Sequence, residues 1–367
     1  RMIQEGNIIA LLVLLAWPLV AVVLFKKLPL ERALIWSILG AYMFMPQISA
    51  IDLPIVPALN KETIPNLMAF IICLSIWGKM PDLFPKSTFG RVLLVMFIVS
   101  PAITVLTNLE IIRFGVDQFG SMALVDPNAL ETWALPGLRA YDSVSALANQ
   151  IFLMLPFFLA RVVLRSEEAI REILFALIVA GAIYSLPMLW ETRMSPQLHT
   201  QIYGFFQHDF AQAMRNGGFR PFVFMPHGLW VAFFAFMCTM AAAASLRETT
   251  RDQAGKRLLI VAFMFGLVVI CKSMGALLFA LMFVPIVLVF RPRFHLTIAA
   301  LLAVLVLSYP LLRGLQRTQR RLVAKVDLGV ALIGDEDDIM LYRRANQALQ
   351  ILLCHQCAMR IAGITQV

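Results

Sequence analysis

The chain has 367 residues, of which 60% are hydrophobic and only 14% are charged, and its mean hydropathy is +0.81. Soluble domains contain roughly 45–50% apolar and about 25% charged residues, so a soluble protein with this composition would expose large apolar patches and aggregate. The composition therefore excludes a soluble domain, and the net charge of +9 indicates loops that Lys and Arg retain on one side of a bilayer rather than a nucleic-acid partner.

Long apolar runs along the chain predict helices that cross a membrane. They lie at about residues 7–25, 32–51, 63–78, 90–109, 143–164, 170–190, 221–246, 257–272, 274–290 and 295–312. Prolines interrupt several of them, which transmembrane helices tolerate as kinks. The predicted fold class is all-α, a polytopic transmembrane bundle of about ten helices that occupies residues 1–312.

The stretch from Leu258 to Phe290 is almost continuously apolar and is too long for one ordinary span. Its only polar interruption is Lys272 followed by Ser273. We therefore expect a helical hairpin whose tip carries these two residues and Gly275.

The basic residues also predict an orientation. Most Lys and Arg lie in the odd-numbered connections between the runs, and the even-numbered connections are longer, so the odd side is predicted to be cytoplasmic. The outer segments are then residues 110–142, residues 191–220 and the polar tail 313–367. An outer amino terminus, and a chain that opens with Arg1 before Met2, fit a protein that has lost an earlier helix.

The five cysteines carry little functional signal. Those within apolar runs are expected to behave as small hydrophobic residues; they are Cys73, Cys238 and Cys271. Cys354 and Cys357 form a lone C-x-x-C that lacks the following His of a haem site, and neither a disulfide nor a metal site is favoured there.

The second outer segment and the start of the run that follows it concentrate ionisable side chains. They are Glu191, Arg193, His199, His208, Asp209, Arg215, Arg220 and His227. An ionisable residue that faces lipid is costly, so such groups usually face a cavity or water. We therefore expect the segment to carry the chemistry of the protein.

Arg215 and Arg220 are the strongest candidates, because a guanidinium group offers planar, permanently charged donors that match phosphate oxygens. The Gly217–Gly218 pair would let the backbone approach a ligand closely. A helix that begins near Pro221 would add a partial positive charge and free N–H groups. Together these features predict an anion site at the outer face of the membrane.

Other interpretations of the segment remain open. The arginines could contact lipid head groups, or they could form ion pairs with Glu191 and Asp209. A metal site is not favoured, because His208 and Asp209 are adjacent and would point to different faces of a helix, and no third ligand is evident.

His227 is expected about two turns inside the seventh helix, as a general base, a hydrogen-bonding partner or a packing residue. Lys272, at the hairpin tip on the same outer side, would add a cation to the site or extend to lipid head groups.

Three short stretches resemble the O-antigen ligase and polymerase superfamily of bacterial membrane proteins. The run Arg215–Gly228 resembles its "R-x-x-G-x-F … P-N/H" signature, and Cys271–Ala276 resembles its later "S-R/K-(S)-x-G/A" hairpin. Asp338–Ala345 looks like the onset of the segment that precedes its "P-x-x-G-x-G" motif. The resemblance covers about residues 60–346.

The resemblance implies a glycosyltransferase with a GT-C-like fold in the bacterial inner membrane. Such a protein moves a glycan from an undecaprenyl-diphosphate carrier to lipid A-core or to a growing polysaccharide at the periplasmic face, without a nucleotide sugar, a metal or another cofactor. It assigns diphosphate binding to Arg215 and Arg220, with Lys272 as a third cation. The remaining candidates are Arg193 and His208 for substrate binding and His227 as the catalytic or supporting group.

The sequence departs from the family after Ala345, where the expected Pro and Gly-x-Gly run is missing and the chain continues differently to Val367. The family's catalytic histidine, which lies in a later outer segment, has no clear match. A truncated or frameshifted member, and hence an inactive remnant, would have this pattern.

A transporter or flippase for a lipid-linked or anionic substrate is the alternative from another functional class. It would have ionisable residues near the bilayer midplane and inverted repeats. Ionisable groups instead gather in outer loops and no repeat is evident, which favours the enzyme.

Overall fold

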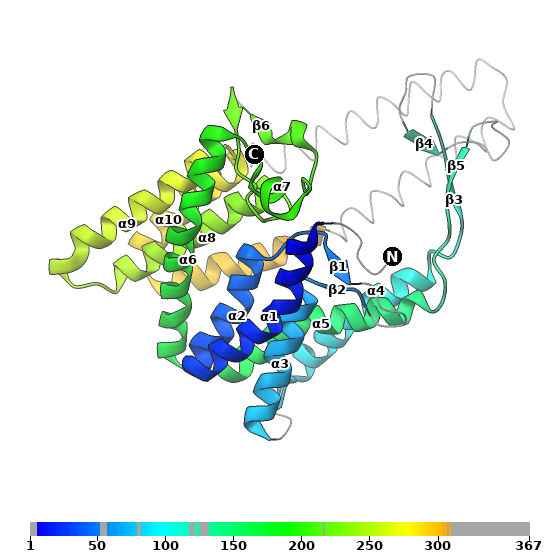
Figure 1. The fold of residues 1–367 in the computed structure, drawn as a ribbon. Helices are drawn as coiled ribbons and strands as arrows, with labels where there is room; N and C mark the ends of the chain where they lie inside the picture. Colours follow the sequence, from blue (N-terminus) through cyan, green and yellow to red (C-terminus); the bar gives the residue numbers. More distant parts are fainter. Residues whose placement is uncertain are drawn as a thin grey trace, which may run out of the picture. The chain divides into compact units, whose positions relative to one another are not determined.

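A computed structural model describes residues 6–51, 57–78, 82–116, 122–124, 132–215, 217–306 and 308–309 (Figure 1). The predictions for the tail 313–367, for Cys354 and Cys357 and for the motif at 338–345 lie outside these residues. The chain divides into two compact units, Arg1–Val289 and Phe290–Val367.

The described chain is mostly helical, and each predicted apolar run contains most of one helix, consistent with the prediction of a helical membrane protein. The first unit contains α1 (Ile8–Lys27), α2 (Leu30–Phe44), α3 (Thr63–Trp77), α4 (Thr88–Leu106), α5 (Asp142–Val163), α6 (Glu167–Met194), the short α7 (Leu198–Tyr203), α8 (Gly228–Arg247), α9 (Arg251–Ile270) and α10 (Met274–Val289). In the second unit, the described residues form the apolar helix Pro292–Val306.

Among the described residues, six helices are long and apolar enough to cross a membrane; they are α1, α4, α5, α6, α8 and the residues Asp252–Ile270 of α9. The prolines predicted to lie within spans are inside helices, at Pro18, Pro101, Pro156, Pro187 and Pro285. The predicted hairpin is also present, since α9 and α10 are separated only by Cys271, Lys272 and Ser273.

Short antiparallel strands, which the apolar pattern does not predict, lie in three connections, and the first of them corrects the predicted run 32–51, because α2 ends at Phe44 and Ala50–Ile51 is a strand. β1 (Ala50–Ile51) pairs with β2 (Leu59–Asn60), and β6 (Met214–Arg215) pairs with β7 (Gly218–Phe219). In the predicted outer segment 110–142, β3 (Ile112–Val116) lies between β4 (Met122–Leu124) and β5 (Thr132–Leu135).

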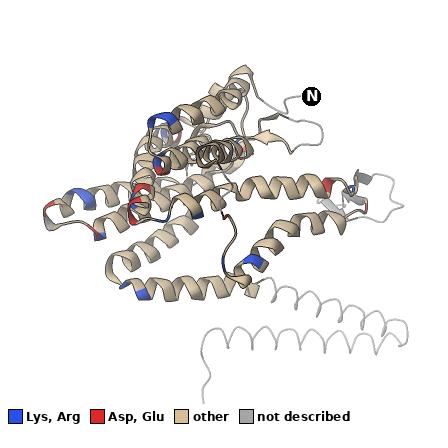
Figure 2. Cartoon of the chain, turned by 90° about the horizontal axis from the view of Figure 1, so that it is seen from below, with Lys and Arg blue, Asp and Glu red and all other residues tan. Residues whose placement is uncertain are grey.

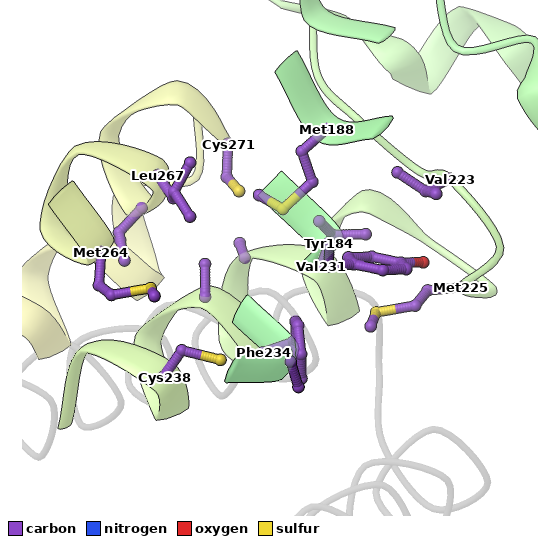
Figure 3. Packing of buried hydrophobic residues seen from close by; sticks show 14 of the residues in the cluster. Tyr184, Met188, Val223, Met225, Val231, Phe234, Cys238, Met264, Leu267 and Cys271 are labelled. Atoms are coloured by element: carbon purple, nitrogen blue, oxygen red, sulfur yellow. The ribbon is translucent and has the colours of Figure 1, made fainter. Parts of the chain in front are cut away.

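The largest buried cluster joins α6, α8, α9 and α10 (Figure 3). Tyr184 of α6 packs edge-to-face on Phe234 of α8, with ring centroids 5.5 Å apart. Gly181 faces Cys238 so closely that a Cβ atom there would lie 2.9 Å from the Sγ atom. Small residues permit this close approach of helices, on which van der Waals packing within a bilayer depends.

Lys, Arg, Asp and Glu gather where the helices of this bundle begin and end, and the helix middles carry few charges (Figure 2). At one end, Lys61 contacts Phe224, and Lys272 contacts Arg215. We call this the site end. At the other end, Arg32 pairs with Glu172. The even-numbered connections that these contacts join therefore lie together, as the alternation of spans predicts.

Candidate functional site

The segment between α6 and α8 is built around the carboxylate of Glu191, in the last turn of α6. One oxygen accepts hydrogen bonds from the backbone N–H groups of Phe222 and Val223, at 2.8 and 2.7 Å. The other oxygen accepts one from the N–H of Leu198 at 3.1 Å. Glu191 is fully buried, so this side chain holds both ends of the segment against α6.

A strained turn follows. Val223 has a φ of +52°, a backbone conformation that is rare for a β-branched residue and that persists only where the surroundings impose it. The hydroxyl of Tyr184 accepts a hydrogen bond from the N–H of Phe224 at 3.1 Å. The side chain of Gln207 donates to the carbonyls of Val223 and Met225. Contacts from several elements therefore fix residues 222–225.

Two contacts with residues outside this segment, Lys61 and Gln47, hold it in place. Lys61, in the connection before α3, donates from Nζ to the carbonyl of Phe224 at 2.6 Å. His199 accepts from the N–H of Gln47 through Nε2 and donates from Nδ1 to the carbonyl of Phe205. Burial lowers the pKa of His199 to about 4, so this histidine is a neutral structural link.

The prediction that the seventh helix begins near Pro221 is wrong, because α8 begins at Gly228. The backbone of Phe222 and Val223 is committed to Glu191, and the positive φ of Val223 is incompatible with a helix. His227 is therefore not two turns inside the helix. It is the N-cap, and its Nδ1 accepts from the N–H of Leu229 at 3.0 Å.

Arg220 lies directly against the start of α8. A Cβ atom on Gly228 would be 2.5 Å from its Nε atom, so the guanidinium group packs on the first residue of the helix. The side chain is 5% exposed, and its Nε has no hydrogen-bond partner. Burial, and then the nearby Arg215, lower the pKa of Arg220, which remains charged near neutrality.

Two more cations approach the same place. Arg215 lies in β6, and the chain turns at Gly217, which has a φ of +69°. Lys272 donates from Nζ to the carbonyl of Arg215 at 3.2 Å, and this Nζ lies close to Gly218. The structure therefore brings the β6–β7 hairpin and the tip of the α9–α10 hairpin together.

The two histidines complete the group. The rings of His208 and His227 are 4.6 Å apart, and both contact the ring of Phe222. The Nε2 of His227 donates to the side-chain oxygen of Gln212 at 3.0 Å. Burial, followed by the charge of Arg220 and the other nearby cations, lowers the pKa of His227 and favours its neutral form.

We call these residues the basic cluster, with members Arg215, Arg220, Lys272, His208 and His227. Of the predicted site residues, only Arg193 is outside it. Its side chain is exposed on the last turn of α6. In the described part of the chain, no contact links it to the cluster.

The alternative ion pairs of the arginines with Glu191 and Asp209 do not form. Glu191 binds backbone N–H groups, and Asp209 caps a short helical turn by accepting from the N–H of Ala211 at 3.0 Å. Two salt bridges, Arg32–Glu172 and Arg171–Glu248, lie at the end of the bundle opposite the cluster. Among the described residues, no carboxylate therefore forms a salt bridge with Arg215, Arg220 or Lys272.

Among the residues that the structure describes, no group of three or more His, Cys, Asp or Glu side chains is arranged to hold a metal ion. Comparison of the chain with protein-family models, curated proteins and solved structures finds no match.

The sequence alone did not identify Lys61 or the role of Glu191. Both act on the backbone of a segment far along the chain, and no local pattern encodes such a contact. The available signal was weak: each is an ionisable residue beside an apolar run, where a charge needs a partner or water.

Proposed function

We propose that this protein is a GT-C-like membrane glycosyltransferase of the bacterial inner membrane. It moves a glycan from an undecaprenyl-diphosphate carrier to lipid A-core or to a growing polysaccharide at the periplasmic face. The observation that carries the proposal is the buried guanidinium of Arg220, which lies on the amino end of α8 with Arg215 and Lys272 nearby. Among the described residues, no carboxylate forms a salt bridge with it.

A diphosphate is the ligand whose charge fits this arrangement. The amino end of a helix carries a partial positive charge and free N–H groups, and guanidinium groups bind phosphate oxygens in pairs. A buried cation without a partner is unfavourable, so an arriving anion would gain the interaction that the protein lacks. The Nε of Arg220 is such a free donor.

Exposed apolar side chains near the basic cluster could contact the lipid tail of such a ligand. Apolar side chains adjacent in sequence to the cluster are exposed, and they are Met214, Leu229, Trp230 and Met274. A ligand with a charged head and a long apolar tail would contact both kinds of surface. This juxtaposition favours a lipid-linked diphosphate over a free one.

In the proposed reaction, the acceptor hydroxyl attacks the anomeric carbon of the glycan, the bond from that carbon to the diphosphate oxygen breaks, and the lipid diphosphate leaves. The hydroxyl proton passes to a base. Negative charge grows on the phosphate oxygens, so fixed cations such as Arg215 and Arg220 lower the barrier.

His227 is the candidate base. Its ring nitrogens are engaged with Leu229 and Gln212, so proton transfer requires the Nδ1 contact to open. Until then it acts as a neutral support for the start of α8.

A transporter or flippase remains the second candidate class. It would place its charged residues near the middle of the spans, whereas the basic cluster lies where α6, α8 and α9 end or begin. The position of the cluster therefore supports an enzyme at the membrane surface.

Glycan transfer by the full chain, reconstituted with undecaprenyl-diphosphate-linked glycan and an acceptor, tests the proposal. Arg220→Gln removes the charge, and we expect at least a hundredfold loss of transfer, since one such electrostatic group contributes about 3–4 kcal/mol to catalysis. Arg193→Gln, in the same segment but outside the cluster, is the matched control and should transfer normally. Equal transfer by the two variants would reject the assignment.

Orientation has its own test. With Cys354 and Cys357 replaced by Ser, Gln201→Cys at the site end should react in intact cells with a membrane-impermeant maleimide. Glu167→Cys, an exposed position at the opposite end, should react only after lysis. The reverse pattern would overturn the periplasmic position of the cluster.

A further inference from the structure

Lys61 is a buried basic residue that neither the sequence pattern nor the proposed reaction uses. Its side chain is 5% exposed, and its Nζ donates a 2.6 Å hydrogen bond to the carbonyl of Phe224. The ring of Tyr42 lies 5.7 Å from the same nitrogen. The lysine therefore reaches from the connection before α3 into the turn that precedes α8.

A lysine in this place is not explained by stability alone. Burying an ammonium group is costly, and no salt bridge to Lys61 forms among the residues with described side chains. The nearest acidic neighbour in sequence, Glu62, is exposed. An apolar side chain would fill the space without that cost, so the Nζ donor of Lys61 has a specific task.

That task is evident from the backbone it contacts. The N–H groups of Phe222 and Val223 are held by Glu191, and the N–H of Phe224 is held by Tyr184. Lys61 binds the carbonyl on the other side of the same turn. The strained φ of Val223 needs such opposed contacts, because otherwise the turn would relax.

The turn positions the cluster. Arg220 precedes it by one intervening residue, Pro221, and Pro226 separates it from His227 and Gly228 at the start of α8. Arg220 reaches its place against Gly228 only if the chain reverses between them, and the turn provides that reversal. A shift of the Phe224 carbonyl would therefore move Arg220 relative to the amino end of the helix.

We propose that Lys61 is a positioning residue of the basic cluster: through its hydrogen bond to the carbonyl of Phe224 it fixes the turn that seats the Arg220 guanidinium on the first residue of α8. The inference rests on the proposed function, since it names a further residue on which anion binding at that site depends. Lys61 itself does not touch the ligand.

The experiment measures the affinity of the full chain in nanodiscs for undecaprenyl diphosphate, together with amide hydrogen exchange in residues 222–225. The variants are Lys61→Met, which removes the donor, and Lys61→Arg, which keeps one. Lys86→Met, an exposed lysine at the opposite end, is the matched control. Arg220→Gln reports whether the anion site exists at all.

We expect Lys61→Met to weaken affinity about tenfold, the equivalent of one lost hydrogen bond to a charged group, and to speed exchange at 222–225. Its thermal stability at pH 6 should not fall below that of the wild type, because a buried charge has been removed. Lys61→Arg should recover most of the affinity, and Lys86→Met should change nothing. If Lys61 served stability alone, Lys61→Met would lower the unfolding temperature without a selective change in amide hydrogen exchange at residues 222–225.

Unchanged affinity and unchanged exchange in Lys61→Met would overturn the inference. If Lys61→Met does not fold, Lys61→Arg decides: wild-type-like affinity supports positioning by a donor, and a tenfold loss despite normal folding contradicts it. If Arg220→Gln binds as the wild type does, the proposed function fails, and the exchange data alone then test whether Lys61 fixes the turn.

Discussion

The two ends of the helical bundle handle their charges in opposite ways. At the end opposite the site, Arg32 forms a two-point ion pair with Glu172, at 2.9 and 2.6 Å, and Arg171 lies 3.5 Å from Glu248. At the site end, the carboxylate of Glu191 binds backbone N–H groups.

The difference shows how a basic cluster is kept available. At the opposite end, carboxylates pair with Arg32 and Arg171 within the protein. At the site end, Glu191 and Asp209 accept hydrogen bonds from backbone N–H groups. Neither pairs with Arg220, whose buried Nε donor has no partner. Charge that is not neutralised internally is available to an external anion.

The largest effect should come from the residue that creates this difference. Glu191→Ala removes a buried acceptor of three backbone N–H groups, and we expect a loss of about 3–5 kcal/mol in the free energy of unfolding. Thermal unfolding in detergent measures the loss, and exchange should rise first at 222–223. Glu110→Ala, on an exposed residue, is the control, and equal stability of the two variants would contradict the scaffold described for the site.

A pH-dependent effect should come from Lys61. Burial lowers its pKa from 10.5 to about 7, while the carboxylate of Glu62 opposes the shift and the neutral His199 and Tyr42 lie nearby. Between pH 7 and pH 10 the unfolded chain holds a proton on Lys61 that the folded protein has lost. Stability must therefore rise with pH by up to about 1.4 kcal/mol per unit, and this rise should be absent from Lys61→Met.

The difference in unfolding temperature between the wild type and Lys61→Met, measured at pH 7, 8 and 9, checks this prediction because other titrating groups cancel. A difference that stays constant across the range would show that Lys61 is not buried as described.

A smaller effect should follow when the guanidinium is displaced without loss of its charge. In Gly228→Ala, the new Cβ would lie 2.5 Å from the Nε of Arg220, so the side chain must move away from the helix start. We expect about tenfold weaker binding of undecaprenyl diphosphate, or about 1.4 kcal/mol. Gly266→Ala, where a Cβ meets nothing within 4 Å, should bind normally. Equal affinities of Gly228→Ala and Gly266→Ala would contradict the requirement that the guanidinium group of Arg220 lies against the start of α8.

The smallest effect is expected at the opposite end. Arg32→Met breaks a solvent-exposed ion pair, and exposed pairs contribute little to stability. Affinity for undecaprenyl diphosphate should be unchanged, and the unfolding temperature should move only slightly. A loss of affinity in Arg32→Met would erase the functional contrast between the two ends.

The helices could be predicted from the sequence because long apolar runs leave few other choices. Even the hairpin tip at Lys272 was evident, since a charge in the middle of an apolar stretch must reach water. Most residues of the basic cluster could also be predicted, because all of them except Lys272 lie within one short stretch of the sequence.

The start of α8 could not be predicted in the same way. Pro221 and the apolar residues after it favour a helix locally, but a carboxylate 31 residues earlier captures the N–H of Phe222. The role of Lys61 was hidden for the same reason, since its partner Phe224 is 163 residues away. The position of Arg193 was also hidden, because nearness in sequence to the other candidates does not show that this residue, exposed on the last turn of α6, makes no contact with the cluster among the described residues.

The central claim is that the basic cluster binds a lipid-borne diphosphate, and a direct affinity measurement tests it best. Binding of undecaprenyl diphosphate and of undecaprenyl monophosphate to the full chain in nanodiscs should be compared for the wild type and for Arg220→Gln, with unfolding temperatures measured in parallel. The account predicts that the wild type prefers the diphosphate and that Arg220→Gln, folded normally, loses both the preference and about thirtyfold in affinity, as for a lost charge-assisted pair. Equal affinity of the folded variant and the wild type for both lipids would contradict it.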